Sequence, residues 1–167
     1  MFFRICAAYA KFLHVMVFVM GCTLIFSVGL QVAGRYVPFI PPYLWTLEVT
    51  NFALIWAIFI GSILGIRYEK HFVVDIFEMG GKKINPKLNF YLRILNNATA
   101  LAITGVFIRY GWEYFVKWGM IQTSDITGVN LGWLYASVPF AGVSWLLFIA
   151  ENFLKEFVVK PGVAARS

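Results

Sequence analysis

The sequence predicts an all-α integral membrane protein, a bundle of four transmembrane helices with one short interfacial amphipathic helix. The first observation is composition: 60% of the 167 residues are hydrophobic and only 13% are charged, about half the charged fraction of an average soluble domain. The second is the presence of four apolar stretches, each of the roughly 20 residues that a spanning helix needs. The length fits one domain, and we expect a single membrane domain over residues 1–167.

The predicted spans cover about residues 12–34, 44–66, 88–108 and 131–154. In lipid, every backbone N–H and C=O must be satisfied inside the segment, so uninterrupted apolar stretches of this length are expected to be helical. A proline-rich link follows the first span, because prolines break a helix and define where the next one starts. After the third span, Arg109, Glu113 and Lys117 recur at a spacing of four, which predicts an exposed, charge-paired continuation of that helix.

The link at about residues 68–86 is too polar to cross a membrane. Apolar residues alternate there with acidic residues and lysines, which is typical of a helix that lies on the membrane surface with its apolar side down. Gly80 and Gly81 are expected to end this helix, and Pro86 to begin the next element.

The basic residues predict the orientation. A net charge of +6 in a soluble protein would suggest nucleic acid, but in a membrane protein it first indicates sidedness, and we expect no nucleic-acid partner. With four crossings, eleven of the 14 Lys and Arg residues fall on the side of the N-terminus and three fall on the other. Both termini are therefore predicted to be cytoplasmic, with membrane lipids as partners of the basic side.

Glu48 is the most informative single residue, because it lies just inside the second predicted span. An ionisable residue in a membrane segment is by default a functional hypothesis. The carboxylate could bind a proton, a sodium ion or an organic cation. Alternatively, Glu48 could lie near the outer interface and form an ion pair with Arg35, which would fix the hairpin between the first two spans.

No pattern in the sequence indicates catalysis, a cofactor or a metal site. The histidines, His14 and His71, do not form a pair that could ligate haem, and Cys6 and Cys22 do not complete a zinc spacing. We therefore expect a chain that is not an enzyme and has no catalytic or metal-binding residues and no cofactor of its own. Gly61 and Gly65 form a GxxxG pattern that could allow another helix to approach the second span closely, although such a pair can also arise by chance.

An ordered set of landmarks resembles a known family. The set comprises Pro42, Trp45, Glu48, Trp56, Phe59, Gly61, Arg67, His71, Asp75, Gly132, Trp133 and Pro139. In order and spacing it resembles the small membrane subunit, the Q-type small permease, of tripartite ATP-independent periplasmic (TRAP) transporters. The resemblance extends over nearly the whole chain, including span number and link lengths.

The resemblance implies a subunit of a bacterial inner-membrane transporter. Such a subunit pairs with a large permease, which carries the substrate and sodium sites and moves like an elevator. A periplasmic binding protein delivers an organic acid anion, such as a C4-dicarboxylate or sialic acid, and a sodium gradient drives import. The small subunit is then a scaffold, and its structural or interface positions are expected at Arg35, Trp45, Glu48, Trp56, Gly61, Gly65, Arg67, His71, Asp75, Gly132 and Trp133.

Two positions depart from the family pattern. Leu47 stands where many members have a second carboxylate, and Asn51 stands where many have an arginine. These departures favour a structural role for Glu48, with Arg35 or with a partner subunit, over a sodium or metal site. The alternatives are a self-sufficient, proton-coupled exporter of the small multidrug type that works through Glu48, and a membrane assembly factor without transport activity.

Overall fold

The computed structural model describes residues 2–68 and 86–154, and the regular structure in this part is helical apart from one β-bridge between Thr123 and Asn130. The helices are α1 (Phe2–Tyr36), α2 (Trp45–Arg67), α4 (Pro86–Trp118), α5 (Gly132–Tyr135) and α6 (Ser137–Leu154). The predicted all-α class is confirmed. The predicted interfacial helix falls mainly on residues 69–85, which lie outside the described residues, as do His71 and Asp75.

Three helical stretches are long and apolar enough to cross a membrane: α1, α2, and α5 with α6 taken together. Helix α2 matches its predicted span to within one residue at each end, whereas α1 begins ten residues before its predicted start. The early start of α1 has a simple reason, because neither proline nor glycine interrupts residues 2–12. Crossing by α4 stays a prediction, since its uncharged stretch, residues 94–108, is shorter than the roughly 20 residues of a typical span.

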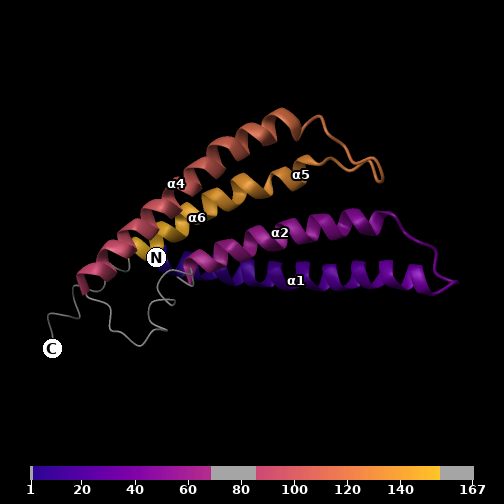
Figure 1. Cartoon of the computed structure of the whole chain (residues 1–167), viewed down its shortest axis with the longest axis horizontal. Helices are drawn as coiled ribbons and strands as arrows, with labels where there is room; N and C mark the ends of the chain where they lie inside the picture. The colour runs from indigo at the N-terminus through magenta and orange to yellow at the C-terminus, as the bar shows by residue number, and fades with distance from the viewer. Residues whose placement is uncertain (1, 69–85, 155–167) are drawn as a thin grey trace.

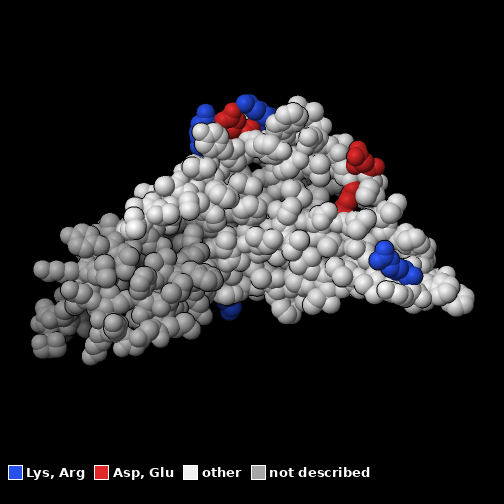
Figure 2. All heavy atoms as spheres, in the orientation of Figure 1, with Lys and Arg blue, Asp and Glu red and all other residues white. Residues whose placement is uncertain are grey.

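The charge-paired continuation of α4 is confirmed. The helix runs on to Trp118, and Glu113 accepts hydrogen bonds from Arg109 at 2.9 Å and from Lys117 at 2.5 Å. Arg109 and Lys117 are exposed and Glu113 is partly exposed, and Figure 2 shows charged groups gathered over α4 on a face that is otherwise largely uncharged.

The last predicted span is divided at Ala136 into α5 and α6. Pro139 explains the division, because proline has no N–H with which to continue the hydrogen-bond ladder back to Tyr135. Next to the division, the Ser137 hydroxyl donates to the carbonyl of Leu134 at 2.7 Å. The chain nevertheless continues in one direction through α5 and α6 (Figure 1).

The helices form two hairpins, α1 with α2 and α4 with α6 (Figure 1). The hairpins meet around a core formed by the first half of α1, the second half of α2, and α6. The buried residues of this core are Cys6, Ala10, Leu13, Ile60, Ile63, Leu64, Ala141, Trp145 and Phe148. At the other end of the molecule the hairpins separate, so the first turns of α2 face the link between α4 and α5 (Figure 1).

Polar side chains fasten the helices to one another. Tyr9 of α1 and Ser144 of α6 lie within hydrogen-bond distance at 2.7 Å, and the indole of Trp145 donates to Ser62 of α2 at 3.2 Å. Because water is absent from a bilayer core, such groups must find protein partners. These bonds therefore hold the hairpin of α1 and α2 to α6 of the other hairpin.

Candidate functional site

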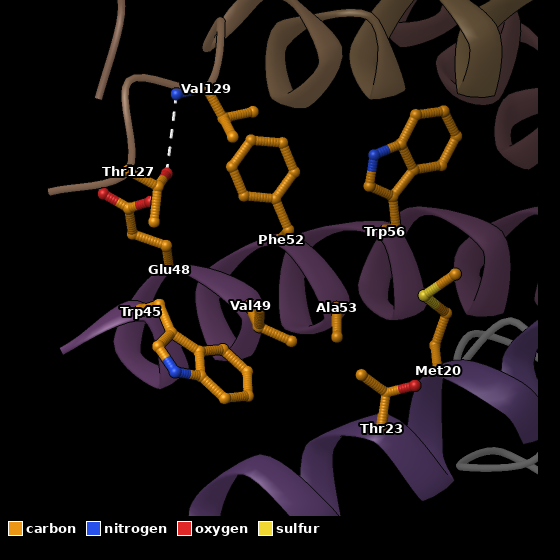
Figure 3. Close-up of a pocket in the computed structure, with 10 residues that line it drawn as sticks. All are labelled: Met20, Thr23, Trp45, Glu48, Val49, Phe52, Ala53, Trp56, Thr127 and Val129. Atoms are coloured by element: carbon orange, nitrogen blue, oxygen red, sulfur yellow. Dashed lines mark hydrogen bonds between the residues drawn. The ribbon is translucent and has the colours of Figure 1, made fainter. Parts of the chain in front are cut away.

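A pocket of about 490 Å³ opens where the two hairpins separate (Figure 3). Its lining comes from α1, α2 and the link before α5, and comprises Met20, Thr23, Trp45, Glu48, Val49, Phe52, Ala53, Trp56, Thr127 and Val129. Among these described lining residues, Glu48 is the only charged one. The pocket is therefore an apolar, aromatic cavity with a single negative charge at one end.

Helix α2 places Glu48 in its first turn, on the same side as Phe52 and Trp56. Residues four apart share a helix face. Figure 3 shows Glu48 and Phe52 directed toward the segment that carries Thr127 and Val129, while Trp56 points toward the helices that follow this segment. The hydroxyl of Thr127 donates a hydrogen bond to the Glu48 carboxylate. This contact fastens the link between α4 and α5 to the start of α2.

The link is shaped to present Thr127. The amide of Gly128 donates to the carbonyl of Ser124 at 3.0 Å, and Ser124 in turn accepts the amide of Ile126 at 3.1 Å. Gly128 has a φ of 70°, a conformation that glycine adopts without steric cost. The Thr127 hydroxyl also accepts the amide of Val129 at 3.4 Å, which orients it toward Glu48 (Figure 3).

The predicted ion pair between Arg35 and Glu48 is not formed in the described part of the chain. The reason is helix geometry, because each residue turns an α-helix by about 100°. Thr50, two residues after Glu48, faces α1, where its hydroxyl lies 2.9 Å from Ser27. Glu48 therefore points away from α1, while Arg35 is exposed in the last turn of that helix.

Two further predicted positions meet beside the pocket. The indole N–H of Trp56 donates to the backbone carbonyl of Trp133 at 3.2 Å, which joins α2 to α5. The ring of Trp56 also packs on Phe140, with centroids 5.6 Å apart. Trp45 lies at the rim and is 41% exposed.

The family model for "Tripartite ATP-independent periplasmic transporters, DctQ component" matches residues 24–158. The chain belongs to this family. No curated protein matches the chain. The chain is therefore a component of a TRAP transporter. The matched range contains α2, α4, α5 and α6 and most of the residues that line the pocket.

A second cluster of this DctQ chain lies at the opposite end of α2. Arg67 forms an ion pair with Glu151 of α6 at 3.3 Å, and their side chains are 13% and 1% exposed. The guanidinium also lies 5.3 Å from the ring centroid of Phe148, and the Asn152 amide donates to the carbonyl of Ile66 at 3.0 Å. Arg67 was expected from the family pattern, and the structure places it where it joins the two hairpins.

The glycines of the DctQ chain behave differently from one another. A Cβ at Gly61 would meet nothing within 4 Å, so no helix in the described part of the chain approaches this residue of the GxxxG pattern. At Gly132 a Cβ would lie 2.4 Å from the carbonyl oxygen of Gly119. Close approach therefore occurs between the end of α4 and the start of α5, and Gly132 is the predicted position that requires glycine.

Sequence reasoning missed Thr127 and Glu151. A signal existed for Glu151, because it is a carboxylate inside the last predicted span, and an ionisable residue in a span usually pairs with another group. Thr127 gave no signal, since a threonine in a polar link is ordinary. In the described part of the chain no three His, Cys, Asp or Glu side chains are grouped to hold a metal ion, and the pocket offers a carboxylate and a hydroxyl among apolar walls.

Proposed function

We propose that this DctQ component is the fixed, membrane-anchored subunit of a sodium-driven TRAP transporter. In this proposal a periplasmic binding protein delivers an organic acid anion, of the C4-dicarboxylate or sialic acid kind, to a large permease that carries the substrate and sodium sites. The family match over residues 24–158 carries the proposal, because it assigns the chain to one component of a tripartite machine.

The architecture supports a scaffold role. An elevator transporter needs one part that stays still in the bilayer while another slides. The two hairpins are held together by a common core and by the Arg67–Glu151 pair, so they form one body. The outer surface is strongly apolar: on α1, Phe18, Ile25 and Phe26 are 71%, 78% and 65% exposed, and such a surface must be covered by lipid or by a partner subunit.

Four crossings with both termini in the cytoplasm complete the proposal. In this orientation α4 is the third crossing, the Arg67–Glu151 pair lies at the cytoplasmic end, and Glu48 with the link around Thr127 lies at the periplasmic end. The excess of basic residues on the proposed cytoplasmic side supports this assignment. The multidrug-exporter alternative needs Glu48 deep in a dimer interface, but Glu48 lies in the first turn of α2, so we set that alternative aside.

Uptake by the reconstituted transporter tests the proposal. Vesicles containing the large permease, with binding protein and labelled organic acid outside, should accumulate substrate only when this chain is present and an inward sodium gradient is imposed. Equal uptake by vesicles that lack this chain would contradict the proposal. Uptake driven equally well by a potassium gradient would contradict its sodium coupling.

A further inference from the structure

We propose that the Glu48 pocket receives a basic side chain of the large permease, carried by an apolar segment of that subunit. This inference rests on the proposed function, because it takes the large permease as the partner. It names a contact face that family membership alone does not give. It also assigns a cation to a carboxylate that lacks one among the described residues of its own chain.

The charge of the pocket requires a complement. Glu48 is the only charged side chain among the described lining residues, and no Lys or Arg in the described part of the chain lies within ion-pair distance of it. An ionised carboxylate can accept about four hydrogen bonds, and Thr127 supplies one. A carboxylate at a membrane boundary that becomes covered by protein needs a cation, since an unpaired buried charge is costly.

The aromatic walls favour a guanidinium or ammonium group as this cation. Phe52 and Trp56 lie along the same side of α2 as Glu48, and Trp45 closes the rim (Figure 3). Rings of this kind attract a cation through their negative faces. Arginine fits best, because its planar group can stack on an indole while it donates two hydrogen bonds to one carboxylate.

The size and walls of the pocket favour a protein segment over an isolated ion. A volume of about 490 Å³ lies within the range of roughly 300–1,000 Å³ of pockets that hold ligands of drug size. A single basic side chain is smaller than such a ligand, so apolar neighbours from the same segment would fill the rest of the pocket. Apart from Glu48, the polar side-chain groups of the lining are the two threonine hydroxyls and the indole N–H groups. Thr23 donates to the carbonyl of Val19 at 2.9 Å, and Trp56 donates to Trp133.

A crosslinking experiment identifies the occupant. Phe52→p-benzoylphenylalanine places a photoreactive ring in the pocket at an aromatic position. The full chain is expressed with the large permease, irradiated in native membranes, and digested for mass spectrometry. We expect a crosslink to the large permease within about one helical turn of an Arg or Lys. Crosslinks only to lipid, to a second copy of this chain, or to nothing would overturn the proposal.

Charge variants of Glu48 test the pairing itself. The measured quantity is retention, the amount of large permease that still co-purifies with the tagged chain after a series of detergent washes. Glu48→Gln should weaken retention at least about ten-fold, because truncating one member of a buried interface charge pair is strongly unfavourable. Glu48→Lys should weaken it further, and Glu48→Asp should keep most of it. Exchanging the basic residue of the large permease that lies next to the crosslink for glutamate should restore the retention that Glu48→Lys loses.

Matched controls separate the pairing from folding. Glu113→Gln removes a carboxylate whose partners are Arg109 and Lys117 of the same chain, and it should leave retention unchanged. Thr127→Val removes the hydroxyl that fastens the link but keeps the carboxylate, and it should weaken retention less than Glu48→Gln does. Loss of retention by Thr127→Val equal to that of Glu48→Gln would overturn the proposal, because Glu48 would then act only by holding the link.

The two proposals fail in different ways. If the wild-type chain does not retain the large permease, the proposed function itself is wrong. If the wild type retains it and Glu48→Gln and Glu48→Lys retain it equally well, only the pocket assignment is wrong.

Discussion

At the scale of single residues, the Arg67–Glu151 pair shows what a buried charge does in the DctQ chain. Glu151 is almost fully buried in α6, and Arg67 reaches it from the last turn of α2 while also packing on the ring of Phe148. Breaking a buried ion pair by removing one partner leaves the other charge uncompensated. The pair therefore fixes the junction of the two hairpins more than it adds net stability.

Arg67→Gln should lower the free energy of unfolding of the full chain by about 3 kcal/mol, at the lower end of the cost of breaking a buried pair because Arg67 is partly exposed. Thermal unfolding in mild detergent, followed by near-UV circular dichroism, measures the change. The double variant Arg67→Met with Glu151→Leu should recover most of the loss, since similar apolar groups can replace a buried pair. An unchanged unfolding temperature for Arg67→Gln would contradict a role for this pair.

At the scale of elements, the contact between the end of α4 and the start of α5 depends on glycine. Gly132→Ala would bring a methyl group to 2.4 Å from the Gly119 carbonyl, and overpacking of this kind typically costs about 1–3 kcal/mol. Gly61→Ala is the matched control, because it meets open space inside α2 and should be neutral or stabilising by up to about 1 kcal/mol. The unfolding temperature of Gly132→Ala should therefore fall, while that of Gly61→Ala should stay the same or rise. An equal fall in both would refute this account.

The C-terminal end of α4 should respond to acid. The hydrogen bond from Lys117, followed by the charges of Lys117 and Arg109, holds the pKa of Glu113 below its usual value. A lowered pKa in the folded state stabilises the helix end above the usual glutamate pKa, and this contribution is lost as the pH falls through the lowered value. At neutral pH, amide protection factors near Trp118 should thus be higher in the wild-type chain than in the Glu113→Gln variant. The two sets of values should converge between about pH 5 and pH 3. Protection that differs equally at all pH values would contradict the ion-pair explanation.

The elements also show how far the sequence could predict this structure. The span of α2 and the continuation of α4 followed from hydrophobic length and charge spacing, which are local properties. The break at Ala136 could have been placed from Pro139 and was not. The contact of Glu48 with Thr127 joins residues 79 positions apart, and nothing local in the link distinguishes Thr127 from its neighbours. The sequence therefore offered only Arg35 or a group on a partner subunit as the partner of Glu48.

At the scale of the whole molecule, the orientation is a testable prediction. The prediction is four crossings with both termini in the cytoplasm. A single cysteine introduced at Asp125 should therefore react with a membrane-impermeant maleimide in spheroplasts, whose inner membrane is intact. Single cysteines introduced at Lys11 or Lys155 should react only after the inner membrane is opened. The native Cys6 and Cys22 are replaced by serine in this background. Labelling of all three positions from the same side would contradict the orientation.

The central claim is that this DctQ chain works as the fixed partner of a large permease, and co-purification from the native membrane tests it most directly. The tagged full chain is extracted in mild detergent, and every protein recovered in stoichiometric amount is identified by mass spectrometry. The account predicts one large, very hydrophobic permease at a ratio of one to one. A homodimer without any permease would contradict the account and would return Glu48 to consideration as an ion-coupling residue.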